Sequence, residues 1–287
     1  MRREWPLVGR KSDLAELVEL VASSRSSRPG AAGAGSGGVI LRGEIGIGKT
    51  RLLTELVTAV RDIGFGTRLV RASASDVPLG CFTDLLTARL GDRLPTVSPE
   101  ILYHEAIAAL MAEAAAAGRW LLAIDDLTQL DGASAAAIHQ FLMASPVPLV
   151  ATARTEEDYP APFHGLWREG RLLIQEIEPL PEAAAGRLVD AVLDGPVGVW
   201  TRHRLVALAG GNPLVLRELI EAAERVGTLV PVDGTWRLAE GFQAATPQLR
   251  TLVEQRFANV SPTLREASEL IALTEPIEVD TLVDLAG

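Results

Sequence analysis

The chain has 287 residues, of which 48% are hydrophobic and 22% are charged, with a formal net charge of −10. This composition is typical of a folded protein with two or three domains and excludes a largely disordered chain. The acidic balance disfavours direct binding to DNA, because affinity for nucleic acid depends on clustered Lys and Arg.

The sequence shows no pattern typical of disulfides, metal sites, signal peptides or membrane spans. Cys81 is the single cysteine, so no disulfide forms within the chain, and the four histidines are not at metal-ligand spacing. No apolar segment follows the charged N-terminus as in a signal peptide, and the apolar stretch 107–124 is interrupted by Glu113 and Arg119. We therefore expect a cytoplasmic protein with no membrane partner.

The first part of the chain alternates strand and helix patterns. Apolar spacing predicts a helix from Leu14 to Val21 with Ser12 capping its first turn, then a flexible Ser- and Gly-rich loop over 23–38. Short apolar runs predict strands at 39–41, 68–71, 120–124, 148–151 and 172–177. The pattern predicts an α/β fold, a three-layer αβα core around a mostly parallel sheet.

Beyond residue 180 the pattern is mainly helical. Helices are predicted at 183–193 and 202–209, and Asn212 with Pro213 forms an N-cap and first helical position for a third. Asp233-Gly234 predicts a hairpin between 229–232 and 235–238, and two further helices are predicted at 249–257 and 264–273. A small helical unit therefore follows the sheet.

A glycine-rich loop lies between the first predicted strand and its helix. GEIGIGKT, residues 43–50, fits the Walker A pattern of P-loop NTPases, in which backbone N–H groups enclose phosphates. Lys49 is expected to bind the β- and γ-phosphates of ATP or ADP, and Thr50 to bind Mg²⁺. A glycine turn without a ligand is the alternative interpretation. The predicted nucleotide contacts are Gly43, Glu44, Ile45, Gly46, Ile47, Gly48, Lys49, Thr50 and Arg51.

Two later strands end in polar residues that complete such a site. The strand at 120–124 leads into Asp125 and Asp126, the form of a Walker B segment, in which Asp125 would hold Mg²⁺ and Asp126 would orient or deprotonate the attacking water. Arg154 follows the next strand and is a candidate contact to the γ-phosphate. Helix capping by the acids and simple solvation of the arginine are the alternatives.

Five segments together resemble a known family. LVGRKSDL, GEIGIGKTRLL, LLAIDDLTQLD, LVATART and GGNPLVLREL, in this order, resemble the STAND class of signal-transduction P-loop ATPases, and more closely the N-terminal AAA-type ATPase region of large LuxR-family transcriptional regulators. The resemblance implies that Val8, Gly9 and Arg10 lie near the adenine and that Pro213 closes over it. It also implies a partial winged-helix domain after residue 225, giving domains at 1–177, 178–225 and 226–287.

The chain departs from that family in two ways. Its members continue into a helical sensor region and a DNA-binding helix-turn-helix, so the sequence is expected to be a fragment that contacts DNA only through an absent domain. Asp126 stands where many related hydrolytic ATPases carry glutamate, which predicts slow turnover. Self-association is a further partner interaction that the resemblance allows.

Three functions remain open at this point. The first is a nucleotide switch that binds ATP with Mg²⁺ and hydrolyses it slowly. The second is an ATP-driven AAA+ machine acting on nucleic acid or protein, which the acidic charge disfavours. The third is an interaction module that holds ADP without hydrolysis. A Ras-type GTPase is disfavoured, because neither lysine lies in an NKxD motif.

Overall fold

The computed structural model describes residues 5–23, 37–72, 77–155, 157–239 and 242. The loop predicted over 23–38 and the helices predicted at 249–257 and 264–273 lie wholly or almost wholly outside the described residues.

The strands of the main sheet are β1 (Gly38–Gly43), β2 (Gly66–Arg71), β3 (Trp120–Asp125), β4 (Leu149–Arg154) and β5 (Leu172–Glu176). The helices associated with this sheet are α1 (Lys11–Ser23), α2 (Lys49–Asp62), α3 (Thr83–Leu90), α4 (Pro99–Ala117), α5 (Gly132–Ala144) and α6 (Ala161–Arg168). Short 3-10 turns are η2 (Gly80–Phe82), η3 (Gly91–Thr96) and η4 (Leu127–Gln129).

The main sheet is parallel throughout, with the strand order β2-β3-β4-β1-β5. This confirms the predicted α/β fold with a parallel sheet. The order places β4 between β1 and β3, so the carboxyl ends of these three strands are neighbours. Gly43 at the end of β1 pairs in register with Arg154 at the end of β4. Residues that follow three separate strands are therefore brought to one edge of the sheet, where ligands bind in open α/β sheets.

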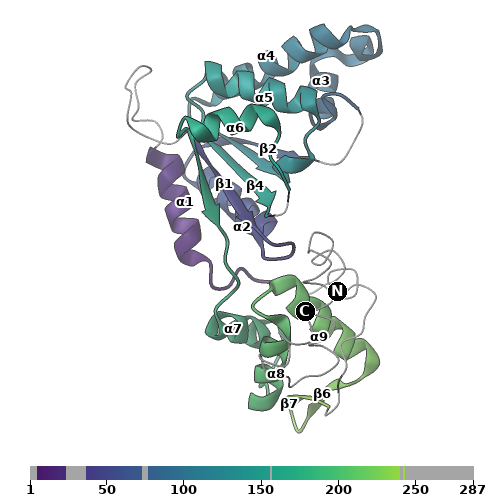
Figure 1. Ribbon diagram of the computed structural model, residues 1–287. Helices are drawn as coiled ribbons and strands as arrows, with labels where there is room; N and C mark the ends of the chain where they lie inside the picture. The colour runs from purple at the N-terminus through teal and green to yellow at the C-terminus, as the bar shows by residue number, and fades with distance from the viewer. Residues whose placement is uncertain (1–4, 24–36, 73–76, 156, 240–241, 243–287) are drawn as a thin grey trace, which may run out of the picture.

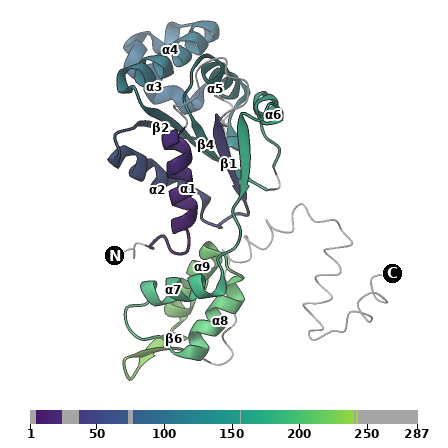
Figure 2. The same ribbon diagram turned by 90° about the vertical axis from the view of Figure 1, so that its left-hand side faces the viewer.

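Helices cover both faces of the sheet (Figure 1, Figure 2). Along β1, Val39 and Leu41 pack toward α1 and α2, whereas Ile40 packs toward α3–α6, because successive strand side chains point to opposite faces. Strands buried on both faces need continuous apolar runs, which is why WLLAI in β3 is entirely buried. Each face thus has its own hydrophobic cluster.

A helical unit follows the sheet and lies beyond its carboxyl edge (Figure 1). It consists of α7 (Glu182–Val192), α8 (Val199–Ala209), α9 (Pro213–Val226) and the antiparallel hairpin β6 (Leu229–Val232) and β7 (Thr235–Leu238). Leu229 and Leu238 of the hairpin pack into the same cluster as the three helices. The predicted hairpin is confirmed, and positive φ angles at Asp233 and Gly234 match its tight turn. The domain boundaries at 177 and 225 stay predictions.

Two local features concern the predicted helices. The helix α1 begins at Lys11, so Ser12 lies inside it and is not its N-cap, and the prediction that Ser12 caps the first turn was wrong. In the third helix of the helical unit, the N-cap prediction is confirmed, since the side chain of Asn212 accepts hydrogen bonds from the N–H groups of Leu214 and Val215. Within the described part of the chain, no helix is both long and apolar enough to span a bilayer.

Candidate functional site

The phosphate loop runs from the end of β1 to the start of α2. Gly48 is the N-cap residue of α2 with a φ of 104°, and no side chain caps this helix. The first N–H groups of a helix lack intrahelical acceptors, and the helix dipole adds partial positive charge at this end. The loop therefore leads into a helix N-terminus that can accept an anionic group.

Gly46 is required by the packing around the loop. Its φ is +80°, and a Cβ atom there would lie 2.5 Å from the Cβ of Leu214 and 2.8 Å from the Oδ1 of Asn212. Only glycine allows α9 to approach the loop so closely.

Lys49 lies inside the loop that precedes it. Its ammonium group donates hydrogen bonds of 2.8 Å to the backbone carbonyls of Gly43 and Glu44, and the residue is only 7% exposed. A compact cation with three donors suits phosphate binding at this position. The structure thus places the predicted lysine within the predicted loop, while its contact to nucleotide stays a prediction.

Thr50 and Asp125 meet across two elements. The hydroxyl of Thr50 donates a 2.9 Å hydrogen bond to Oδ1 of Asp125, and the hydroxyl of Thr152 in β4 donates to the same oxygen at 2.8 Å. Hydroxyl and carboxylate oxygens are the ligands that Mg²⁺ prefers, usually with water and substrate phosphates completing the shell. The donor set therefore fits the predicted Mg²⁺ ligands Thr50 and Asp125.

Asp126 has an unusual backbone and a perturbed carboxyl group. It adopts the left-handed region with φ 57°, and its N–H donates to the hydroxyl of Thr152 at 2.8 Å. Burial raises the pKa of Asp126 above its ordinary value, while the nearby Arg154 opposes this shift. The side chain of Asp126 keeps 35% of its surface exposed, so water can reach the carboxylate.

Arg154 lies between two carboxylates at the same edge of the sheet. Its guanidinium is 3.8 Å from Oδ2 of Asp126 and 3.1 Å from Oε1 of Glu157. Glu157 also accepts hydrogen bonds from Thr128 and Gln129 of η4. The structure therefore brings the three predicted catalytic residues, Lys49, Asp126 and Arg154, to one region of the molecule.

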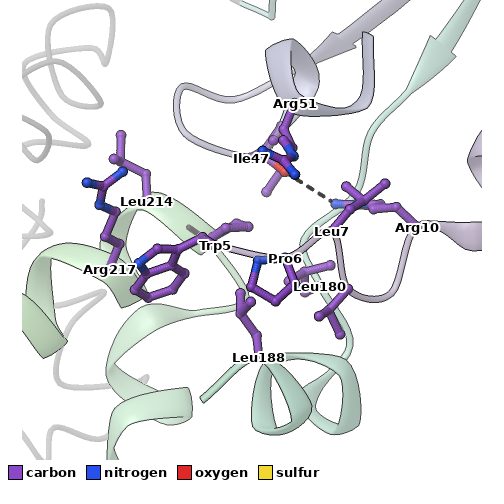
Figure 3. Close-up of a pocket in the computed structure, with 13 residues that line it drawn as sticks. Trp5, Pro6, Leu7, Arg10, Ile47, Arg51, Leu180, Leu188, Leu214 and Arg217 are labelled. Atoms are coloured by element: carbon purple, nitrogen blue, oxygen red, sulfur yellow. Dashed lines mark hydrogen bonds between the residues drawn. The ribbon is translucent and has the colours of Figure 1, made fainter. Parts of the chain in front are cut away.

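A cavity of about 440 Å³ lies where the phosphate loop faces the helical unit (Figure 3). Its size is within the range of small-molecule sites. It is lined by Trp5, Pro6, Leu7, Val8, Arg10, Ile47, Gly48, Arg51, Leu180, Leu188, Pro213, Leu214 and Arg217. Of the residues expected near the base, Val8, Arg10 and Pro213 line this cavity. Gly9 does not, and its backbone instead passes against α7, where a Cβ would lie 2.7 Å from that of Ala184.

Arg10 forms contacts among three segments of the chain beside the cavity. Its guanidinium donates a 3.5 Å hydrogen bond to the backbone carbonyl of Ile47 (Figure 3). It also donates to the backbone carbonyl of Glu178 and lies 3.5 Å from the carboxylate of Asp13. The residue is 8% exposed. Arg10 therefore joins the N-terminal segment to the phosphate loop and to the connector that follows β5.

The sequence did not reveal that α9 bonds directly to the phosphate loop. The side-chain amide of Asn212 donates a 2.9 Å hydrogen bond to the carbonyl of Ile45, and the N–H of Leu214 donates to that of Gly46 at 3.3 Å. Thr152 and Trp5 were also missed. A threonine inside the apolar run LVATAR was the one signal that pointed to Thr152, because a buried hydroxyl needs a polar partner.

The comparisons with known proteins agree with this geometry. The family model for the AAA ATPase domain matches residues 6–151, slightly more than half of the chain. Among solved structures, the chain is similar to the Aeropyrum pernix ORC1 protein in complex with DNA, at 16% identity and a TM-score of 0.53, covering 99% of this chain and 78% of that one.

A second similar structure is the Aeropyrum pernix ORC2 protein in ADPNP and ADP complexes, at 13% identity and a TM-score of 0.54, covering 100% of this chain and 81% of that one. At such low identity these likenesses show the fold alone. No curated protein matches the sequence.

Proposed function

The chain belongs to the AAA ATPase domain family, and from this premise we propose that it is a nucleotide-dependent switch that binds ATP with Mg²⁺ and hydrolyses it slowly. In this function the nucleotide sets the position of the helical unit relative to the sheet. Hydrolysis to ADP resets that position.

The observation that carries this proposal is the direct bonding between α9 and the phosphate loop. Asn212 and Leu214 donate to the carbonyls of Ile45 and Gly46, two loop residues whose neighbours would enclose the phosphates. A change in loop conformation on nucleotide binding therefore acts on α9 without an intermediate element. Such a two-state element, biased by a ligand, is what a switch requires.

Each residue of the site would have its own role in ATP binding and hydrolysis. Lys49 would neutralise charge on the β- and γ-phosphates, and Asp126 would orient the attacking water and accept its proton. Arg154 lies close enough to Asp126 to contact a γ-phosphate beside it. Mg²⁺, held by Thr50 and Asp125, would supply further charge neutralisation at the phosphates. Because aspartate is one methylene shorter than glutamate, we expect slow turnover.

The finer family assignment is part of the proposal. The segments VGR, the paired aspartates and GNP, together with Walker A, support membership of the STAND class and the ATPase region of a LuxR-family transcriptional regulator. In that setting the switch would transmit nucleotide state to the DNA-binding domain of such a regulator, in the cytoplasm.

The test starts from nucleotide-stripped protein and measures ATP uptake with Mg²⁺ by calorimetry. Lys49→Ala should abolish uptake, whereas Lys11→Ala, which changes the chain's other lysine on the exposed start of α1, should leave it unchanged. Asp126→Asn should retain bound ATP without hydrolysing it. Equal ATP affinity in Lys49→Ala and wild type would refute the proposal.

Two further outcomes would point to the alternative functions. If the purified protein releases ADP when it is denatured and shows no ATP turnover, a non-hydrolysing interaction module would be favoured. Hydrolysis that rises with added duplex DNA would favour a machine acting on nucleic acid, a comparison prompted by the DNA complex of the ORC1 protein.

A further inference from the structure

Trp5 lines the cavity beside the phosphate loop. It belongs to the N-terminal segment that precedes α1, and it is half-buried against the hydrophobic cluster of the helical unit. In Figure 3 the indole lies between Pro6 and Arg217, on the opposite side of the cavity from Ile47 and Arg51. The cavity is thus closed on one side by an aromatic ring and on the other by the phosphate loop.

The lining of the cavity indicates the kind of ligand that fits there. Gly48 and Arg51 lie at the end of the cavity next to the start of α2, where a helix N-terminus can accept an anionic group. Most of the remaining lining side chains are apolar, from Pro6 and Leu7 to Leu180, Leu188 and Leu214. A ligand with a flat apolar body and an anionic tail matches this distribution, and Trp5 is the one aromatic residue among the thirteen described residues that line it.

We propose that Trp5 is a base-contacting residue, which stacks its indole on the purine ring of the nucleotide bound at the phosphate loop. This inference rests on the proposed function and assigns the wall of its base subsite. Stacking uses the face of the ring and makes no hydrogen bond to its edge, so Trp5 contributes affinity for any purine. Its packing against the helical unit holds the ring in place before the nucleotide arrives.

A purely structural role for Trp5 makes a different prediction. If the indole only filled the cluster of the helical unit, its loss would affect all ligands of the phosphate loop equally. If it stacks on the base, its loss affects ATP and not inorganic tripolyphosphate, which has the phosphate tail without the purine.

The experiment measures both ligands with Mg²⁺ by calorimetry on the full chain. In Trp5→Ala the dissociation constant for ATP should rise about tenfold or more, and in Trp5→Phe it should stay within about threefold of wild type. The dissociation constant for tripolyphosphate should be unchanged in both variants. Trp200→Ala is the matched control, because Trp200 in α8 is 51% exposed and does not line the cavity.

Indole fluorescence gives an independent readout. Addition of ATP should quench emission of wild type, and that component should be missing in Trp5→Phe. Unchanged ATP affinity in Trp5→Ala, or a parallel loss of ATP and tripolyphosphate, would overturn the assignment of Trp5 while leaving the proposed function intact. Failure of the wild-type chain to take up ATP would overturn the proposed function itself.

Discussion

The side-chain amide of Asn212 donates a 2.9 Å hydrogen bond to the backbone carbonyl of Ile45, although 167 positions separate the two residues. The same side chain caps α9 through its carbonyl oxygen, which accepts from the N–H groups of Leu214 and Val215. Asn212 is 2% exposed. One buried amide therefore serves both the phosphate loop and the helix that faces it.

Replacing Asn212 should separate these two contributions. Asn212→Ala removes the cap and the bond to Ile45 and should lower the free energy of unfolding by about 1–3 kcal/mol. Asn212→Ser keeps a capping hydroxyl but cannot reach the loop, so it should cost less than the alanine variant while weakening ATP binding. Denaturant unfolding and calorimetry measure these effects. Wild-type stability and affinity in both variants would show that the bond contributes nothing.

Gly46→Ala should damage the loop by two separate effects. A left-handed backbone costs a non-glycine residue about 1–2 kcal/mol, and the added Cβ would lie 2.5 Å from that of Leu214. Gly64→Ala is the matched control, since Gly64 has φ +85° with no atom within 4 Å of the added Cβ. Thermal unfolding should show a larger loss for Gly46→Ala than for Gly64→Ala. Equal losses of stability in the two variants would mean that α9 moves away from the added Cβ without destabilising the protein.

Thr152→Val should uncouple the two acids at the end of β3. Valine has nearly the same shape, but it leaves the N–H of Asp126 without its acceptor and removes a donor to Asp125. We expect a loss of about 1–3 kcal/mol in stability and a fall in the hydrolysis rate. Thr152→Ser restores the hydroxyl and should recover most of both. A valine variant as active as wild type would contradict this role.

Cys81 should react slowly in the folded protein. Burial raises the pKa of its thiol from 9.0 to about 11, with a partly opposing hydrogen bond to Ser134. At pH 8 the reactive thiolate is then about a hundredfold scarcer than in the unfolded chain. Reaction with a chromogenic disulfide reagent, with and without urea, measures this difference. Equal rates in the two conditions would show that the thiol is accessible.

The same shift has a consequence for stability. The folded state holds the thiol proton more tightly than the unfolded state, so its contribution to stability is complete below pH 9 and is lost as pH rises toward 11. Cys81→Ala lacks this contribution. The difference in melting temperature between wild type and Cys81→Ala should therefore change across that interval and stay constant below it.

The sequence predicted the elements whose signals are local. The apolar runs of β1 and β3 and the Asp233-Gly234 turn were found where expected, because burial on both faces and a tight turn impose composition directly. Strand ends were less accurate. The strand β4 continues to Arg154, three residues beyond the apolar run 148–151, because Thr152 bonds to Asp125 of β3 and Arg154 pairs in register with Gly43 of β1.

The part of the candidate site that could be predicted from the sequence is also the part with local signals. Walker A and the paired aspartates are contiguous motifs whose spacing carries the chemistry. Asn212, Thr152 and Trp5 contribute through contacts across many residues, and no local pattern in the sequence shows that Asn212 faces Ile45. The expected position of Gly9 near the base stays a prediction, whereas its close packing against Ala184 is a requirement visible only once both segments are placed.

Arg10 restricts how the helical unit can move. The connector after β5 and the N-terminal segment both run between the sheet and the helical unit, and the guanidinium of Arg10 bonds the N-terminal segment to the connector at Glu178 and to the phosphate loop at Ile47. Two connecting segments that are bonded to each other permit far fewer rotations of the helical unit than a single segment would. The expected motion is therefore a hinge about one axis that passes close to Arg10, so that opening of the cavity and displacement of α9 occur as a single event.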